Sequence, residues 1–347
     1  MSKKSIILVL AIALVVVLSG IGYYAYTSVF SSNTNFSEEQ AVVYIPTGVG
    51  YNTVLDSIQP LLKNTESFEM VADKKGYKLN IRPGRYILKR NMNNNEIVNV
   101  LRSGNTPVKV RFNNQERLEN LAGRVAKQIE ADSLELLQAM KDQEFLAENE
   151  LSEREALSLY IPNQYEFYWN TSAEEFRQRM LQEYNRFWTE ERLKKAEKIN
   201  LTPSQVMVLA SIVQKETAKV DERPKVAGVY MNRYKNGWKL DADPTVIYAI
   251  KDVTQKFDTI IKRVLYKDLE LDSPYNTYLY KELPPGPITM PDISSIDAVL
   301  NYQDHDYFFF VADVENFGYH KFAETLAQHN RNKRDYVRWI NKQGIRR

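Results

Sequence analysis

An uninterrupted apolar run from Ile6 to about Tyr24 constrains the fold of this 347-residue chain more than any other feature. No charged side chain lies between Lys4 and Glu38. A helix needs about 20 apolar residues to cross the hydrocarbon core of a bilayer, so we predict a transmembrane helix over residues 5–27. A cleaved secretory signal is the alternative, but the run is longer than the apolar region of a typical signal and lacks a clear A-x-A cleavage site.

Two lysines before the apolar run indicate which side of the membrane each end of the helix faces. Lys3 and Lys4 are basic, and basic residues favour the cytoplasmic side. We therefore predict that residues 1–4 are cytoplasmic and that the main part of the chain is periplasmic or extracytoplasmic. The chain would be a single-pass protein of the cytoplasmic (inner) membrane. Residues 28–40 are mostly polar and predict a short linker.

The spacing of apolar residues divides the rest of the chain into three parts and predicts an α+β fold. Residues 41–105 predict a small α+β module with a first helix capped by Asn52. This module resembles LysM-like modules, and a small spacer that binds nothing is an equal alternative. Residues 106–198 predict a connecting strand and helices, one of them over about 173–198. Residues 199–347 form the C-terminal domain.

Composition excludes several classes of function. The chain has no cysteine and only three histidines, which excludes a thiol nucleophile and argues against a metal site built on several histidines. A formal charge of +2 gives no broad basic field, so nucleic acid is not an expected partner. A pyridoxal-phosphate lyase would need a phosphate-binding glycine loop, and none of the 13 glycines forms one. We expect no metal and no cofactor.

The segment from Thr202 to Thr217 carries the clearest helix signal. Thr202 is suited to the N-cap, Pro203 to the first helical position, and Gln205 completes a capping box. Residues 206–213 then have almost no polar side chain. A helix that is apolar on all sides is a buried helix.

Glu216 lies at the edge of the apolar stripe of this predicted helix. Residues three and four apart share a helix face, so Glu216 stacks over Ile212 and Val213, whereas Gln214 faces elsewhere. Burial and the C-terminal end of the helix dipole both raise the pKa of a carboxyl group. A carboxyl group that stays protonated near neutral pH can act as a general acid. The alternative is an ordinary glutamate at a helix end, paired with a neighbouring Lys or Arg.

Several motifs resemble one family over residues 201–330. Residues 210–217, ASIVQKET, resemble the A-S-I-V-E-K-E-T motif of the YceG-like (MltG) endolytic murein transglycosylases. Further blocks follow in the family's order, VYMNR at 229–233, DPTVIY at 243–248, SPYNTY at 273–278, LPPGPI at 283–288 and GYHKF at 318–322. The resemblance implies that residues 199–347 are a mixed α/β catalytic transglycosylase domain with a buried catalytic helix.

The resemblance also implies a reaction. These lyases cleave the MurNAc-GlcNAc β-1,4 bond within peptidoglycan strands, leave a 1,6-anhydro-MurNAc end, and so terminate or trim nascent strands. Glu216 matches the catalytic glutamate of the family, while Gln214 stands where the family has another glutamate and cannot be the acid. Asn163-Gln164, Tyr319 and Asp292 are further departures from the family pattern.

Six polar residues are predicted to hold sugar hydroxyl and acetamide groups. They are Asn232, Asp243, Asn276, Thr277, Tyr278 and His320. Each could instead be a turn, loop or structural residue, because Asx and Thr side chains bond to local backbone. The expected partners are glycan strands and membrane lipid, with peptidoglycan synthases or division proteins as further candidates. The alternative function is a non-catalytic, membrane-anchored glycan-binding or division-scaffold protein.

Overall fold

The computed structural model describes residues 2–342, which form an α+β protein with two compact units. The first unit contains residues 2–110, 128–131 and 165–172, and the second contains residues 111–127, 132–164 and 173–342. The elements of the first unit are α1 (Lys3–Phe30), β1 (Gln40–Ile45), α2 (Tyr51–Ile58), α3 (Thr65–Lys74), β2 (Gly84–Lys89) and α4 (Asn94–Ser103). The chain passes between the units in the paired strands β3 (Val108–Phe112) and β4 (Asn163–Phe167).

Helix α1 is a single apolar helix long enough to cross a membrane. Its 28 residues exceed the predicted span of 5–27 by a few residues at each end. Its large apolar side chains are exposed, with Ile7 66% and Leu10 64% accessible, and nothing in the described chain covers them. The predicted N-terminal apolar helix is therefore confirmed, and its composition fits a single-pass anchor.

The segment after α1 packs against the module and differs from the linker predicted over 28–40. Asn33 and Thr34 are buried. The Asn33 side chain donates to Asn94 Oδ1 at 2.7 Å and to the Asn64 carbonyl at 2.8 Å, and Asn94 Nδ2 donates to the Ser28 carbonyl at 2.8 Å. Buried amides require such partners. Polar residues here satisfy one another in the interior, which composition alone did not reveal.

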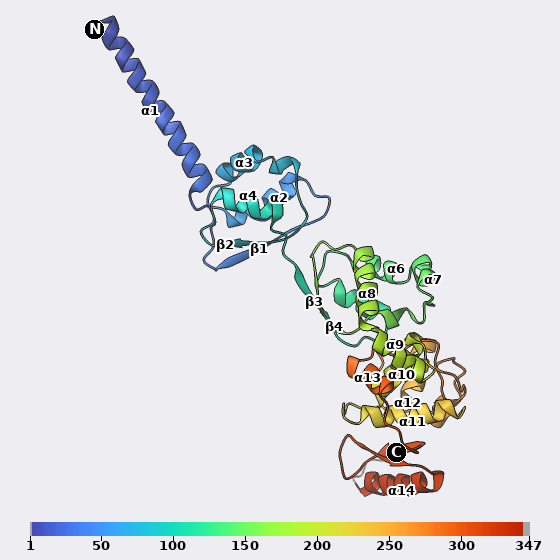
Figure 1. The fold of residues 1–347 in the computed structure, drawn as a ribbon. Coiled ribbons are helices and arrows are strands. Elements are labelled where there is room, and N and C mark those ends of the chain that lie inside the picture. The colour runs from blue at the N-terminus through green and yellow to red at the C-terminus, as the bar shows by residue number, and fades with distance from the viewer. Residues whose placement is uncertain (1, 343–347) are drawn as a thin grey trace. The chain divides into compact units, whose positions relative to one another are not determined.

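The small module is built on the antiparallel pair β1–β2, with α2, α3 and α4 on one side of it (Figure 1). Side chains of β2 alternate between buried and half-buried, and Tyr86 and Leu88 point into the core. The predicted combination of helices and strands in this module is confirmed. Two details were wrong, because α2 begins at Tyr51 so that Asn52 lies inside it, and because α3 was not predicted at all.

The second unit contains most of the predicted connecting region together with the C-terminal domain. Its remaining elements are α5 (Leu118–Val125), α6 (Ser133–Met140), α7 (Gln143–Glu148), α8 (Ala173–Phe187), α9 (Glu190–Lys198), α10 (Pro203–Glu216), α11 (Arg223–Lys235), α12 (Asp243–Thr254), α13 (Ile293–Leu300), β5 (Phe309–Ala312), β6 (His320–Ala323) and α14 (Leu326–Lys342). The helix predicted over 173–198 is two helices. The Thr189 hydroxyl accepts from the Arg192 amide and starts α9 afresh.

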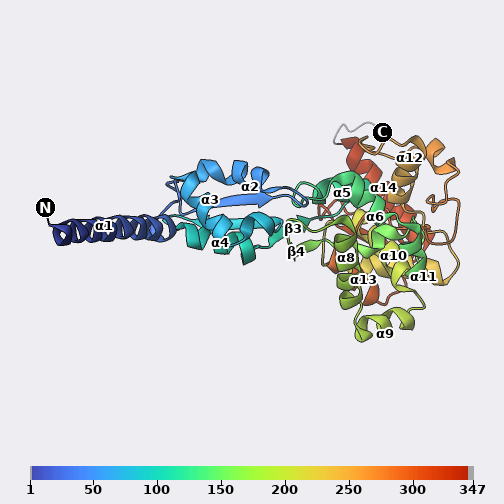
Figure 2. The same ribbon diagram turned by 90° about the horizontal axis from the view of Figure 1, so that it is seen from above.

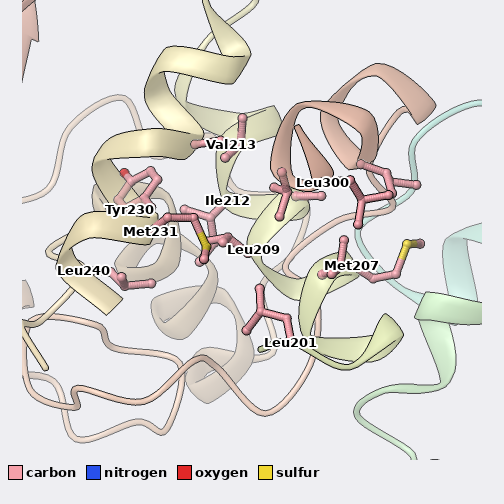
Figure 3. Close-up of a cluster of buried hydrophobic side chains, with 14 of the residues drawn as sticks. Leu201, Met207, Leu209, Ile212, Val213, Tyr230, Met231, Leu240 and Leu300 are labelled. Carbon is pink, nitrogen blue, oxygen red and sulfur yellow. The ribbon is translucent and has the colours of Figure 1, made fainter. Parts of the chain in front are cut away.

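Helix α10 is the centre of this unit, and Figures 1 and 2 both place it among surrounding helices. The predicted capping box is confirmed, because Thr202 and Gln205 exchange hydrogen bonds between side chain and backbone. All residues from 206 to 213 are buried. Figure 3 shows their side chains meeting Met231 of α11 and Leu300 of α13. This packing fixes the C-terminal end of α10.

Candidate active site

Helix α10 delivers Glu216 from the buried core to the edge of a pocket. Glu216 is the last residue of the helix and is half-buried, one turn beyond the fully buried Val213. The Tyr230 hydroxyl of α11 donates to Glu216 Oε1 at 2.6 Å. Within residues 2–342 no hydrogen bond engages Oε2. Oε2 is therefore the oxygen that is free to carry a proton.

The pocket has a volume of about 360 Å³ and combines charged, tyrosyl and apolar walls. Its lining residues come from α10, α11, α12, β5, α14 and two loops, and they are Glu216, Tyr230, Arg233, Leu240, Asp241, Asp243, Tyr278, Phe309, Phe310, Leu326 and His329. Segments more than 100 residues apart in the sequence thus meet around one carboxyl group.

The protonation of Glu216 is tuned to neutral pH. Burial raises the pKa of Glu216 to about 7, against opposing effects of the Tyr230 hydrogen bond and the nearby His320. The neighbouring charge of Asp243 raises the pKa further. The predicted direction of this pKa shift is therefore seen in the structure, with burial as its main cause. A carboxyl group with this pKa can donate and accept a proton in one catalytic cycle.

Removing the Tyr230 hydroxyl is expected to shift the pH dependence of any reaction that uses Glu216. The hydrogen bond from Tyr230 stabilises the charged carboxylate and so lowers the pKa. We expect Tyr230→Phe to raise the pKa of Glu216 and move the basic limb of the pH–rate profile to higher pH. Profiles of both proteins measured from pH 5 to 9 would check this. An unchanged limb would mean that Tyr230 does not act on Glu216.

The raised pKa of Glu216 also predicts a pH-dependent effect on stability. Below its ordinary pKa of 4.5 the carboxyl is protonated in folded and unfolded chains alike. Between 4.5 and about 7 only the unfolded chain releases the proton, so stability falls as the pH rises. The free energy of unfolding of the Glu216→Gln protein, relative to that of wild type, is therefore expected to rise by roughly 1–3 kcal/mol between pH 4 and pH 8. Chemical denaturation at the two pH values measures the difference, and an equal effect at both would contradict it.

Arg233 holds together part of the wall of the pocket that contains Glu216. Its side chain is buried and donates to the carbonyls of Phe308 at 2.7 Å and Leu240 at 2.8 Å. It also pairs with Asp241 at 3.1 Å. Burial raises the pKa of Asp241 although Arg233 opposes this. One guanidinium thus ties two chain segments, Leu240–Asp241 and the residue before β5, to α11.

Of the predicted sugar-binding residues, Asp243 and Tyr278 lie in the pocket. The Tyr278 hydroxyl donates to Asp243 Oδ1 at 2.7 Å. Asp243 is exposed at the start of α12 and Tyr278 is half-buried. Both present polar atoms beside Glu216, as a group that binds sugar hydroxyls would.

Three of the other predicted residues hold the protein backbone instead of lining the pocket. Asn276 is buried, and its side chain donates to the carbonyls of Leu269 and Leu271 at 3.0 and 2.8 Å. The buried Thr277 hydroxyl accepts from the Ala242 amide at 3.0 Å. These contacts position the loop that carries Tyr278 and the residue before α12.

Asn232 is likewise committed to the backbone. Its side chain donates to the carbonyls of His305 at 2.6 Å and Tyr307 at 3.0 Å. It therefore ties α11 to the segment that leads into β5. A role of Asn232 in contact with sugar remains a proposal that these contacts do not favour.

His320 is held beside the pocket by the buried carboxylate of Glu222. The His320 amide donates to Glu222 Oε1 at 2.7 Å, and its Nδ1 lies 2.8 Å from Oε2. Burial opposes ionisation of Glu222, but the hydrogen bonds from His320 hold the pKa of Glu222 below its usual value. His320 does not line the pocket, yet it lies close enough to lower the pKa of Glu216.

Gln214 forms its hydrogen bonds with a different element from the one that Glu216 contacts. Its Oε1 accepts from the Ser295 hydroxyl at 2.6 Å and the Asp292 amide at 3.2 Å, and its Nε2 donates to Asp292 Oδ2 at 3.1 Å. A glutamate could not make the last of these bonds and would repel Asp292. Two departures from the family pattern, Gln214 and Asp292, are thus hydrogen-bonded to each other at the start of α13.

Four residues that line the pocket were not predicted as site residues, namely Tyr230, Arg233, Asp241 and His329. A signal existed for two of them, because Tyr230 and Arg233 are three residues apart and so share a helix face. Asn232, which was predicted, does not line the pocket. Asp241 and His329 reach the pocket only through tertiary folding, and no local pattern marks them.

The fold and the pocket define an α+β protein with an apolar N-terminal helix. Its pocket is polar and contains one half-buried glutamate at the end of a buried helix. A sequence profile of the YceG-like family matches residues 43–335, which is most of the chain. The chain belongs to this family, and the predicted resemblance is confirmed.

Named relatives extend over most of the chain. The endolytic murein transglycosylase of Bacillus subtilis is 28% identical over 319 residues, which cover 85% of this chain and 84% of that protein. The endolytic murein transglycosylase of Streptococcus pneumoniae is 27% identical over 358 residues, covering 92% of this chain and 63% of that longer protein. A crystal structure of a YceG-like protein from Listeria monocytogenes has a TM-score of 0.57 at 28% identity, covering 85% of this chain and 99% of that one.

Proposed function

We propose that this chain is an endolytic murein transglycosylase in which Glu216 is both the acid and the base. The observation that carries the proposal is the Glu216 carboxyl group, half-buried in a polar pocket, bonded to Tyr230 at Oε1 and with a pKa raised by burial to about 7. The family membership and the names of its relatives support the substrate and the reaction class.

The proposed reaction needs only one carboxyl group. Glu216 Oε2–H protonates the bridging oxygen, and the bond from that oxygen to the anomeric carbon breaks. The 6-hydroxyl oxygen of the same sugar attacks the anomeric carbon and returns its proton to Glu216. An internal nucleophile has a high effective concentration, so no water needs to be activated. Asp243 and Tyr278 are placed to hold sugar hydroxyl groups beside Glu216.

A hydrolase is the second candidate, because two further carboxylates line the same pocket. Glycoside hydrolases commonly use a pair of carboxyl groups. Asp243 fits the second position better than Asp241, which is paired with Arg233. A hydrolase would leave a reducing end, whereas the proposed lyase leaves an anhydro end. A non-catalytic glycan-binding or scaffold protein would leave the strands uncut.

The other parts of the chain fit an enzyme held at a membrane. We propose that α1 is a single-pass anchor in the cytoplasmic membrane, with Lys3 and Lys4 on the cytoplasmic side and the second unit outside. We propose further that the module around β1–β2 is LysM-like, with a small spacer that binds nothing as the equal alternative, and that synthases or division proteins accompany the chain. Residues 199–342 would then carry the catalytic site.

Incubation of the purified chain with intact glycan strands tests the proposal. An endolytic lyase shortens the strands from within and yields internal fragments that end in 1,6-anhydro-MurNAc. Mass spectrometry of the fragments would detect them. Strands that keep their length and their ends would contradict the proposal.

A further inference from the structure

A second, larger cavity lies in the second unit, away from Glu216. Its volume is about 560 Å³, compared with about 360 Å³ for the pocket that contains Glu216. No residue lines both cavities. The residues of the larger cavity that matter here are Arg117, Lys141, Arg154, Tyr248, Asp252 and Tyr275.

Helix α12 runs from one cavity to the other. Asp243, in its first turn, lines the pocket of Glu216, and Asp252, near its end, lines the larger cavity. A third cavity of about 160 Å³ lies between them, lined by Pro244 and by Tyr248, which it shares with the larger one. Lys215, next to Glu216 in the chain, also lines this middle cavity. A 12-residue helix is about 18 Å long, so the residues of α12 that line the two cavities are separated by most of the length of the helix.

The lysines that line the larger and middle cavities are all ion-paired with glutamates. Glu116 pairs with Lys215 at 2.7 Å and with Lys251 at 2.8 Å. Lys141 pairs with Glu119 at 2.9 Å and with Glu153 at 3.0 Å. Each of these lysines therefore already has a carboxylate partner within 3.0 Å.

Arg154 differs from the other basic residues of the cavity. Its side chain is exposed, and no ion pair engages it within residues 2–342. Its guanidinium lies 5.8 Å from the centre of the buried Tyr275 ring, and that ring packs on Tyr248 at 4.6 Å. Its backbone carbonyl is packed directly against Gly286, where an added Cβ would collide with it. The cavity thus offers a positioned, unpaired cation beside an aromatic wall.

We propose that the larger cavity binds the part of the glycan strand that extends away from the cleaved bond, with Arg154 pairing with a carboxylate of that strand. The inference rests on the proposed function, since an endolytic enzyme must accommodate strand on both sides of the cut. Guanidinium groups form bidentate hydrogen bonds with carboxylates. Aromatic side chains can pack against sugar rings. The carboxylate is either that of a peptide stem or that of the lactyl group on a bare sugar.

The test compares long strands with fragments too short to reach the larger cavity. For Arg154→Gln, the ratio of kcat/KM on long strands to that on short fragments is expected to fall about ten-fold, as for loss of one charged hydrogen-bonded pair. Arg186→Gln is the matched control, because Arg186 is exposed on α8 and pairs only with its helix neighbour Glu183. It should leave the ratio unchanged.

Strands with and without peptide stems identify the carboxylate. A ten-fold effect only with stem-bearing strands assigns it to the stem, and an effect only after amidase treatment assigns it to the lactyl group. Binding of long strands to the inactive Glu216→Gln protein, with and without Arg154→Gln, should show the same ten-fold difference in Kd. If Arg154→Gln leaves both the kcat/KM ratio and the Kd unchanged with both kinds of strand, the proposal that this cavity binds the strand is overturned. If Glu216→Gln still cuts short fragments, the proposed function fails, whatever Arg154 does.

Discussion

Replacing Glu216 by glutamine is expected to lower the rate of strand cleavage by about 10²–10⁴-fold, since one group supplies both proton transfers. Glutamine keeps the size of the side chain and can still accept the hydrogen bond from the Tyr230 hydroxyl. It cannot donate an acidic proton to the bridging oxygen. Release of anhydro-muropeptides from murein by the two purified proteins measures the loss.

A second glutamate at a helix end provides the control for this loss. Glu148 is the last residue of α7, is exposed, and does not line the pocket. Glu148→Gln makes the same chemical change and should leave the rate within two-fold of wild type, because surface changes have little effect. Equal activity of the Glu216→Gln protein and wild type would rule out the proposed acid and favour a non-catalytic role or a different carboxyl group.

Replacing Arg233 by methionine is expected to destabilise the second unit by about 2–4 kcal/mol. Methionine retains much of the apolar length but donates no hydrogen bond. The carbonyls of Phe308 and Leu240 and the Asp241 carboxylate would then lose their shared partner. Because Leu240 and Asp241 line the same pocket as Glu216, the cleavage rate should fall as well. Urea unfolding in detergent gives the change in stability.

Two further variants separate the hydrogen bonds of Arg233 from its charge. Arg233→Lys keeps the charge, but an ammonium group cannot reach the two carbonyls and Asp241 in one planar geometry. The stability of this variant should therefore lie between that of Arg233→Met and that of wild type. Arg186→Met removes an exposed arginine of α8 and should change stability by less than about 0.5 kcal/mol. Equal unfolding midpoints for Arg233→Met and wild type would show that the contacts of the Arg233 guanidinium do not stabilise the unit.

The buried helix and its terminal glutamate could be predicted because their signals are local. Thr202, Pro203 and Gln205 mark the start of α10, and the apolar residues that follow predict burial on every side. Helix geometry then separates Glu216 from Gln214. The structure agrees with that separation, since the two side chains bond to α11 and to the start of α13.

What the sequence analysis missed falls into two kinds. Helix α3 had a readable signal, with Asn64 as N-cap and Phe68, Val71 and Ala72 at helical spacing, but it was overlooked. The pocket walls had no comparable signal, because they depend on which distant segments pack together. Polar residues near a motif can equally hold backbone, as Asn276 does, and only tertiary contacts distinguish the two roles.

The origin of the new chain end tests the central claim most directly. Intact strands are cut in water enriched in heavy oxygen, and the fragments are weighed by mass spectrometry. The proposed mechanism predicts ends that are one water lighter than reducing ends and free of the heavy isotope, because the sugar's own 6-hydroxyl closes the ring. Reducing ends that carry heavy oxygen would contradict it and would indicate a hydrolase in which Asp243 assists Glu216.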